Sequence, residues 1–361
     1  MCLGTGLRRL KTEKEKGVTR AVGPGAHPVG AWLLVVSAVV STVLVFGVGT
    51  RVNAASEEGA PVAAGGGTAV AGLAAKYPND VGLAKDPDVI FAEDFESWDG
   101  NTPPPGKWHN VSTGGTRRVS IVPGVVGPSG PGKSILELAC WQEPEKSSSA
   151  GLSKRLGNYD DANQGLGDGY EEVYVRYYQK FDKGYTPGVQ NHGSLLGGRD
   201  LTQADAWWVG QADTPDVASH GYYSACLQPD GGGQRRGPFH WRFYSYHCDK
   251  PGRWGDDFTP LKMVTIDLDR WYCLEWHLKL NTAEPLKADA VEELWVDGEL
   301  SIRKDDLRYR KVPQLKITFF SLGTYYHPGL PAKYTAENPI KVYYDNLIIA
   351  RKPVGPVVSD R

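Results

Sequence analysis

Apolar and polar positions alternate through much of the chain. Between Trp271 and Leu280 the even-numbered positions are apolar, and Glu275, His277 and Lys279 stand between them. A period of two is typical of a half-buried β-strand, whose successive side chains point to opposite faces. The segment is therefore predicted to be a strand in which His277 faces away from the core.

The same pattern predicts a hairpin and further strands. Asp297-Gly298 separates two extended runs, and this pair suits a type I′ turn because both central residues take positive φ. Strands are also predicted at Val89–Phe95, Ser134–Cys140, Glu172–Phe181, Tyr222–Leu227, His240–His247, Leu315–Leu322 and Lys341–Ala350. No helical pattern longer than two turns stands out, and 44 Gly and 25 Pro favour turns. An all-β sandwich or barrel is expected.

The N-terminal segment has the pattern of an export signal. Basic residues from Arg8 to Arg20 precede a long uncharged stretch, whose most apolar part is 31–48. Its length falls between that of a signal-peptide core and that of a membrane-spanning helix. We predict a signal helix over 1–54 that is cleaved after Ala54, with an uncleaved membrane anchor as the alternative. The protein is then secreted, periplasmic or held at the cell surface.

Composition divides the rest of the chain into a linker and one domain. Residues 55–75 are rich in Ala and Gly and are expected to be flexible, whereas 76–356 has the composition and length of one large β-domain. After residue 54 the chain carries 33 basic and 40 acidic residues, a net charge of about −7. This balance argues against nucleic-acid binding, which needs an excess of Lys and Arg. We expect a monomer that contacts a membrane only through its N-terminal segment.

Four cysteines remain after the N-terminal segment: Cys140, Cys226, Cys248 and Cys273. An even number in an exported chain suggests disulfides, for which three connectivities are possible. A Cys226–Cys248 bridge is the expected one, since it would close the Gly-rich segment between them. Free buried thiols are the alternative, and no C-x-x-C pair indicates zinc.

Candidate chemistry lies on the strand that begins at His240. Its even-numbered residues are His240, Arg242, Tyr244 and Tyr246, so one face is polar and aromatic. Such a face can form the floor of a glycan groove, with tyrosine rings against sugars and hydroxyls placed for proton transfer. The surrounding segment, 234–253, is locally basic. A solvated sheet face is the alternative interpretation.

A second strand and the segment after it supply further candidates. Arg176 lies on the polar side of the strand at 172–181, which is expected to neighbour the first strand in the same groove. A glycine-rich loop follows and carries Lys183, Gln190, Asn191 and His192. Loops held by a rigid sheet often carry function. Among the histidines His192 is the first choice, because glycines flank it and imidazole titrates near neutral pH.

The order of several short motifs resembles the family 14 polysaccharide lyases and related jelly-roll lyases. These motifs are Tyr174-Val-Arg-Tyr-Tyr-Gln-Lys-Phe-Asp, Ser224-Ala-Cys-Leu, Phe243-Tyr-Ser-Tyr-His, Gly252-Arg-Trp-Gly-Asp256, Trp276-His-Leu-Lys-Leu-Asn281, Leu294-Trp-Val-Asp-Gly298 and Tyr344-Asp-Asn346. The resemblance covers nearly all of 76–356. It implies a concanavalin A-like jelly-roll sandwich of two antiparallel sheets. It also implies β-elimination in a uronic-acid polysaccharide, with no cofactor required.

The resemblance also assigns roles. The family's Tyr-x-Tyr pair falls on Tyr244 and Tyr246, and the resemblance implies that Tyr244 or Tyr246 acts as acid/base. The family's loop lysine falls on His192. Its Ser-x-Arg pair falls on Ser224 and Cys226, so that arginine is absent here, and Arg242 or Arg176 is the expected replacement. Substrate binding is expected from Arg176, Lys183, Gln190, Asn191, Ser224 and Arg242.

Two other functions fit the same fold class. One is a noncatalytic, lectin-like protein that binds carbohydrate, because fold does not fix function. The other is a glycoside hydrolase, which needs two carboxylates across the groove. Glu292 and Glu293 are expected to be solvated beside the hairpin, which does not favour a hydrolase.

A structural Ca²⁺ site is the last candidate. Asp94 and Glu96 follow the first predicted strand and Asp345 lies in the last, and terminal strands of sandwiches often pair. Their carboxylates are the hard oxygen ligands that Ca²⁺ prefers. A surface cluster of carboxylates is the alternative.

Overall fold

The computed structural model describes most of the chain after residue 71. The described residues are 72–122, 134–143, 146–158, 166–189, 191–199, 221–231, 237–252 and 254–359. The expected signal or anchor helix at 1–54 and most of the expected linker lie outside them. Within the described part, no helix has the length and hydrophobicity of a membrane span.

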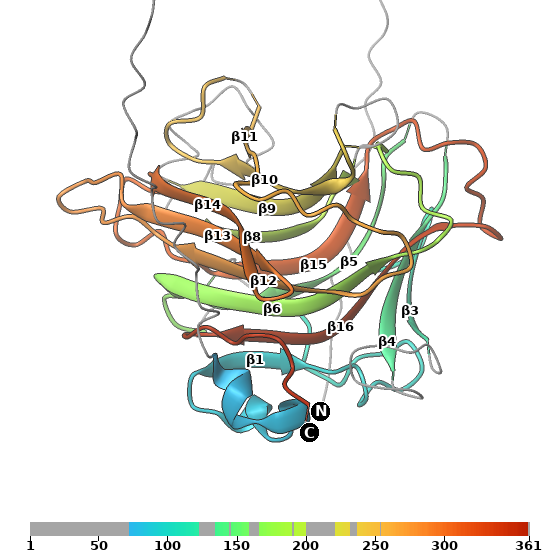
Figure 1. Cartoon of the computed structure of the whole chain (residues 1–361), viewed down its shortest axis with the longest axis horizontal. Coiled ribbons are helices and arrows are strands. Elements are labelled where there is room, and N and C mark those ends of the chain that lie inside the picture. Colours follow the sequence, from blue (N-terminus) through green and yellow to red (C-terminus); the bar gives the residue numbers. More distant parts are fainter. Residues whose placement is uncertain are drawn as a thin grey trace, which may run out of the picture. The chain divides into compact units, whose positions relative to one another are not determined.

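Two antiparallel sheets of eight strands each form the domain (Figure 1), as expected for a jelly-roll sandwich. The sheet that we call the back sheet has the order β14 (Glu299–Leu307), β13 (Ala290–Val296), β12 (Tyr272–Lys279), β6 (Glu172–Phe181), β16 (Ile340–Ala350), β4 (Ile135–Cys140), β3 (Arg117–Val122), with β1 (Val89–Glu93) also paired to β16. The other, which we call the cleft sheet, has the order β11 (Asp256–Phe258), β10 (His240–Tyr246), β9 (Tyr222–Asp230), β8 (Ser194–Arg199), β15 (Phe319–Tyr326), β5 (Ser148–Arg155), β2 (Asn110–Ser112), with β7 (Asn191–His192) also paired to β15.

The core lies between the sheets and is rich in aromatic rings. On β10 the residues that alternate with the polar face point inward, and Phe243 packs against Trp276 of β12 with ring centroids 5.6 Å apart. Trp241 likewise meets Tyr272 at 4.9 Å. Large aromatic side chains bury much apolar surface. The inward face of β10 therefore anchors the strand and turns its other face to solvent.

The predicted hairpin is confirmed. Asp297 and Gly298 join β13 to β14 with φ angles of 52° and 84°, the positive values that a type I′ turn requires. The Asp297 carboxylate also accepts a hydrogen bond of 2.9 Å from the backbone N–H of Cys273. This contact ties the turn to the neighbouring strand β12.

The two ends of the described chain cover the outer face of the back sheet. Three 3₁₀ turns, η1 (Leu73–Lys76), η2 (Pro78–Asp80) and η3 (Leu83–Lys85), lie beside the C-terminal segment (Figure 1). The N–H of Leu73 donates to Pro353 O at 2.9 Å, and Glu275 accepts from the N–H groups of Val354 and Gly355. Residues 72–75, which composition assigned to the linker, therefore pack against the C-terminal segment.

The N-terminal turns that pack on the back sheet also hold Arg176, which was expected to lie in the groove beside β10. The side chain lies on β6 in the back sheet, is fully buried, and pairs with Asp80 of η2 at 2.6 Å. Because β6 and β10 belong to different sheets, they do not share a groove. Alternation correctly predicted which side of β6 is polar, but a single strand's pattern does not reveal which sheet the strand joins.

The Arg176–Asp80 pair provides a stability prediction. Arg176→Met is expected to lower the free energy of unfolding by about 2–3 kcal/mol, because it leaves Asp80 without its partner. Denaturant unfolding measures the change. Lys262→Met is the matched control, since its ion pair with Glu299 is exposed and contributes little. Equal losses in the two variants would contradict the prediction.

The expected Cys226–Cys248 disulfide is wrong. Cys140, Cys226 and Cys273 are buried thiols and Cys248 is half-buried, with none of the four in a disulfide. Extending the β9–β10 register places Cys248 opposite residue 222, four positions from Cys226. That offset is about 13 Å along a strand, whereas bridged cysteines have Cα atoms within about 7 Å. Burial raises the pKa of the Cys226 thiol to about 12, so it stays protonated.

Candidate active site

An open cleft of about 980 Å³ lies on the outer face of the cleft sheet. Its lining includes His192, Ser224, Arg242, Tyr244 and Tyr246, five of the residues that the sequence predicts. The outward side chains of β10 and β9 form one part, and those of β15 and β5 form the other. The polar face predicted for β10 is therefore part of a cleft, with the exception of His240, which does not line it.

The register of the strands gives the cleft a flat floor beside an aromatic wall. Tyr244 lies opposite Cys226, and Cys226 lies opposite Leu195 on the next strand. Farther across, Gly323 of β15 lies opposite Gly151 of β5, so no side chain rises there. A flat floor beside aromatic rings suits sugar rings, which present both apolar faces and hydroxyl groups.

Tyr244 and Tyr246 are two residues apart on β10 and therefore point to the same side. Their hydroxyl oxygens are 3.3 Å apart, and the Tyr244 hydroxyl accepts a hydrogen bond of 2.9 Å from the N–H of Gly255. Burial, followed by the hydrogen bond with Tyr244, raises the pKa of Tyr246. The Tyr246 phenol is therefore protonated at neutral pH and can give a proton to a leaving oxygen.

His192 does not lie in a loop, as the sequence suggested, but on the short strand β7 beside Tyr325 of β15. The next residue must be glycine, because a Cβ at Gly193 would lie 2.2 Å from the carbonyl oxygen of Leu227. This close approach brings the His192 ring against Gln228 of β9. On its other side, Nε2 lies 2.8 Å from Nε2 of His327.

Arg242 lines the cleft and is held by a network of charged and polar side chains. Its Nε is 3.3 Å from a carboxylate oxygen of Asp230, and its Nη1 pairs with Asp257. The guanidinium also reaches the side-chain amide of Gln228. Two carboxylates therefore balance this cation, which holds the amide and through it the His192 ring.

Two further predicted binding residues, Asn191 and Lys183, are not among the residues that line the cleft. Asn191 is buried and structural: its Oδ1 accepts from the Thr324 hydroxyl at 2.7 Å and from the Tyr325 N–H at 3.1 Å. Lys183 is exposed in the turn after β6 and does not line the cleft. Gln190 lies outside the described residues.

Two residues that contact the predicted site residues escaped prediction, namely Gln228, which is buried, and His327, which lines the cleft. Gln228 is buried on β9 and contacts both Arg242 and His192. His327 follows β15, where Ser321, Gly323 and Tyr325 take every second position. Continuing that alternation to residue 327 would have placed His327 on the cleft side.

The expectation that Glu292 and Glu293 are solvated is wrong. Both are buried, and Glu292 points between the sheets, where it accepts hydrogen bonds from Ser245 at 3.0 Å and from the Tyr309 hydroxyl. Burial raises the pKa of Glu292 from its usual value near 4.5 to about 8. The carboxyl is therefore mostly neutral at pH 7 and belongs to the core rather than to a catalytic groove.

Glu292 should make stability depend on pH. The unfolded carboxyl ionises above pH 4.5, but the folded one stays protonated to about pH 8. Between these values the unfolded state binds fewer protons, so stability falls as pH rises. The stability of the native protein relative to Glu292→Gln should decrease from pH 5 to pH 8 in urea unfolding. A constant difference across this range would show that the buried carboxyl is not protonated.

The expected calcium site is not formed. β1 does pair with β16 as predicted, but Asp94 and Glu96 are exposed and cap backbone N–H groups, whereas Asp345 is buried. In the described part of the chain, no three His, Cys, Asp or Glu side chains gather as metal ligands. The pairing of two strands fixes their backbones but does not make their carboxylates converge.

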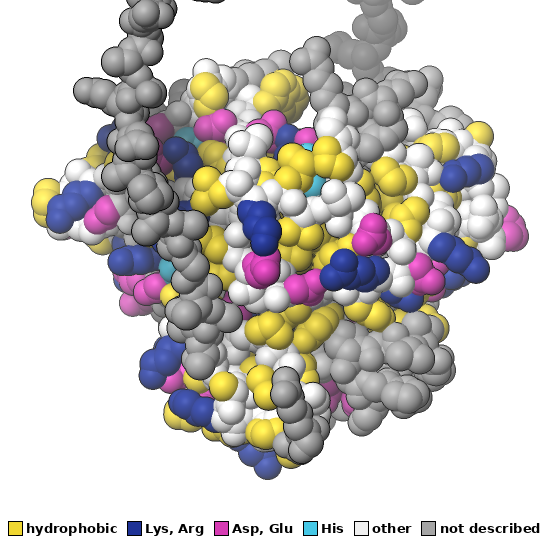
Figure 2. All heavy atoms as spheres, viewed as in Figure 1, with side chains coloured by type: hydrophobic (Ala, Val, Ile, Leu, Met, Phe, Trp, Pro, Cys, Tyr) yellow, Lys and Arg dark blue, Asp and Glu magenta, His cyan; other side chains and the backbone are white. Residues whose placement is uncertain are grey.

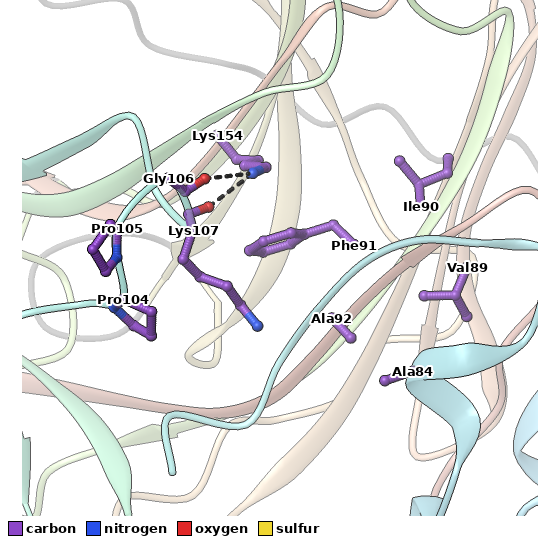
Figure 3. A pocket seen from close by; sticks show the side chains of 10 residues that line it. All are labelled: Ala84, Val89, Ile90, Phe91, Ala92, Pro104, Pro105, Gly106, Lys107 and Lys154. Carbon is purple, nitrogen blue, oxygen red and sulfur yellow. Dashed lines mark hydrogen bonds between the residues drawn. The ribbon is translucent and has the colours of Figure 1, made fainter. Parts of the chain in front are cut away.

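A second, shallower depression of about 460 Å³ lies beside β1. Figure 3 shows Lys107 and Lys154 beside the ring of Phe91, with ammonium nitrogens 5.5 and 4.6 Å from the ring centroid. Lys154 also donates to the carbonyl oxygen of Lys107 at 2.8 Å. The described residues around this depression include no histidine or tyrosine, so the larger cleft is the better candidate for proton transfer.

The surface has no broad basic field on the face that Figure 2 shows, where basic and acidic side chains are interspersed. In the cleft itself, the described lining residues include Arg242, His192 and His327 but no Asp or Glu. An anionic ligand therefore meets no carboxylate among these lining side chains.

Comparisons with known proteins give likenesses to solved structures only. No protein-family description matches the chain, and no curated protein matches it. The alginate lyase Aly36B, solved with an alginate trisaccharide, aligns at a TM-score of 0.46 and 12% identity over 72% of this chain and 97% of that one. The endo-β-1,4-glucuronan lyase of the fungus Trichoderma reesei aligns at 0.46 and 13% over 73% and 100%. A family 14 alginate lyase of Aplysia kurodai aligns at 0.46 and 13% over 68% and 92%.

Proposed function

We propose that this protein is a polysaccharide lyase that cleaves a uronic-acid-containing polysaccharide by β-elimination. The observation that carries the proposal is the meeting of His192 and Tyr244, with ring centroids 5.2 Å apart, in an open cleft beside Tyr246. Elimination needs a group that neutralises the C5 carboxylate, a base for the C5 proton and an acid for the leaving oxygen. Histidine and tyrosine side chains can fill these roles.

The charge of the cleft supports an acidic substrate. A glycoside hydrolase needs a pair of carboxylates that flank the scissile bond, and the described lining residues include none. The same lack of carboxylates avoids repulsion of a polyuronate. We further propose that the protein acts outside the cell or at its surface, where such polymers occur.

A lectin-like role is the second candidate, and one observation favours it. Cys226 stands where the lyase resemblance expects an arginine, and Arg242 is already paired with Asp230 and Asp257. Arg242 is the only Lys or Arg among the described residues that line the cleft, and a paired arginine suits glycan binding without activation of the C5 proton.

One assay separates the two functions. The protein is incubated with alginate, glucuronan and related polyuronates, and the ultraviolet absorbance of the unsaturated product is followed beside a binding titration. A lyase gives rising absorbance. Binding to these polymers without any rise in absorbance would instead support the lectin-like role. His192→Ala, with folding checked by circular dichroism, should abolish most of the absorbance rise.

A further inference from the structure

The Gln228 amide fixes the direction of a chain of hydrogen bonds. One end of the amide faces Nε and Nη2 of Arg242 at 3.1 and 2.8 Å, and the other faces Nδ1 of His192. A guanidinium has only donors, so the amide oxygen must face Arg242. The amide nitrogen therefore donates to Nδ1 of His192.

The acceptor role of Nδ1 determines the tautomer of His192. A neutral imidazole that accepts at Nδ1 carries its proton at Nε2. That Nε2–H points at Nε2 of His327, 2.8 Å away, which must accept the hydrogen bond. His327, when neutral, then carries its own proton at Nδ1. The two imidazoles therefore present opposite functions, a donor on His192 and an acceptor on His327.

Arg242 holds this arrangement in place. Asp230 and Asp257 fix the guanidinium from below, and turning the amide over would set its NH₂ group against the guanidinium. The side chains of Tyr244 and Tyr325 lie around the two imidazole rings. Tyr246 packs against Tyr244 on β10, and the Cys226 thiol lies beside the Gln228 amide.

We propose that the two histidines divide the chemistry of the elimination, with His192 binding the uronate carboxylate and His327 acting as the base. This inference rests on the proposed lyase function. A carboxylate that enters between the rings takes the hydrogen bond from the Nε2–H of His192 and frees the lone pair on Nε2 of His327. The C5–H bond then breaks, its proton passes to His327, and its electron pair forms the C4–C5 double bond. The C4–O bond breaks as Tyr246 protonates the leaving oxygen, and solvent exchange returns the proton from His327 to Tyr246.

Nuclear magnetic resonance of ¹⁵N-labelled full-length protein tests the tautomers without requiring activity. His192 is expected to show a protonated Nε2 and His327 a protonated Nδ1. His240 is an internal reference, because its Nδ1 lies 2.7 Å from the carbonyl oxygen of Pro238 and must donate to it. Gln228→Glu should move a proton to Nδ1 of His192, because a carboxylate only accepts. A protonated Nδ1 on His192 in the unmodified protein would overturn the proposal, whether or not the protein is a lyase.

Kinetics then separate the two roles. His327→Gln should lower kcat by about 10²–10⁴-fold, the usual contribution of a positioned base, with little change in polyuronate affinity. His192→Gln should instead raise KM most. His277→Gln, on the back sheet, is the matched control and should keep native kinetics. If His327→Gln raises KM and leaves kcat intact, the base is assigned wrongly.

Discussion

Tyr246→Phe is expected to lower the turnover of a polyuronate by about 10²–10⁴-fold, the usual contribution of a general acid. The substitution removes only the hydroxyl, so the ring continues to line the cleft and to pack at right angles to Tyr244. Burial keeps the Tyr246 phenol protonated, which is the state required by its proposed role as proton donor for the leaving oxygen. The initial rate of product absorbance measures the effect, and a binding titration should show nearly native affinity.

Tyr343→Phe is the control for this substitution. Tyr343 is also a largely buried tyrosine, but it lies on β16 of the back sheet, where its hydroxyl contacts Asp182. Its loss should leave turnover unchanged. If both variants lose the same activity, the effect of Tyr246→Phe comes from general destabilisation and not from a lost proton donor.

Arg242→Met is expected to weaken polyuronate binding by at least about tenfold, since truncating one member of a partly buried charged network costs about 2–5 kcal/mol. It removes the guanidinium that pairs with Asp230 and Asp257, and it frees the Gln228 amide that orients His192. Titrations at low and high salt measure the change, which should shrink as salt screens the two carboxylates.

A rescue variant tests whether charge is the cause. Arg242→Met combined with Asp230→Asn and Asp257→Asn removes the two carboxylate charges together with the guanidinium, and it should recover most of the affinity. Turnover should stay low, because the Gln228 amide is no longer held. Unchanged affinity in Arg242→Met alone would show that this network does not govern anion binding.

Local pattern was sufficient to predict much of the fold. The strand at Glu172–Phe181 has the predicted bounds, and β10, β12 and β16 differ from theirs by one residue. In β6, β10 and β12, aromatic and branched side chains alternate with polar ones, as a half-buried strand requires, whereas β16 ends in a continuous apolar run. The same alternation placed Arg242, Tyr244 and Tyr246 on one face, and the cleft uses that face.

The parts of the fold and of the candidate site that local pattern did not predict depend on contacts between segments that are distant in the sequence. β5 and β8 contain the runs Ser148–Arg155 and Ser194–Arg199, whose serines and glycines have low strand propensity, and they form strands because β15 pairs with both. Arg176 could not be assigned to a sheet from β6 alone. The meeting of His192 with His327 requires β7 to lie beside the end of β15, a pairing that no local signal predicts.

The most direct test of the elimination is the mass of its products. The protein is incubated with glucuronan or alginate in water enriched in heavy oxygen, and the fragments are analysed by mass spectrometry. If the protein cleaves by elimination, one of the two fragments from each cut is lighter by one water than the corresponding product of hydrolysis. The cleavage itself then incorporates no heavy oxygen. Fragments that gain one heavy oxygen per cut, and carry no double bond, would contradict the lyase function.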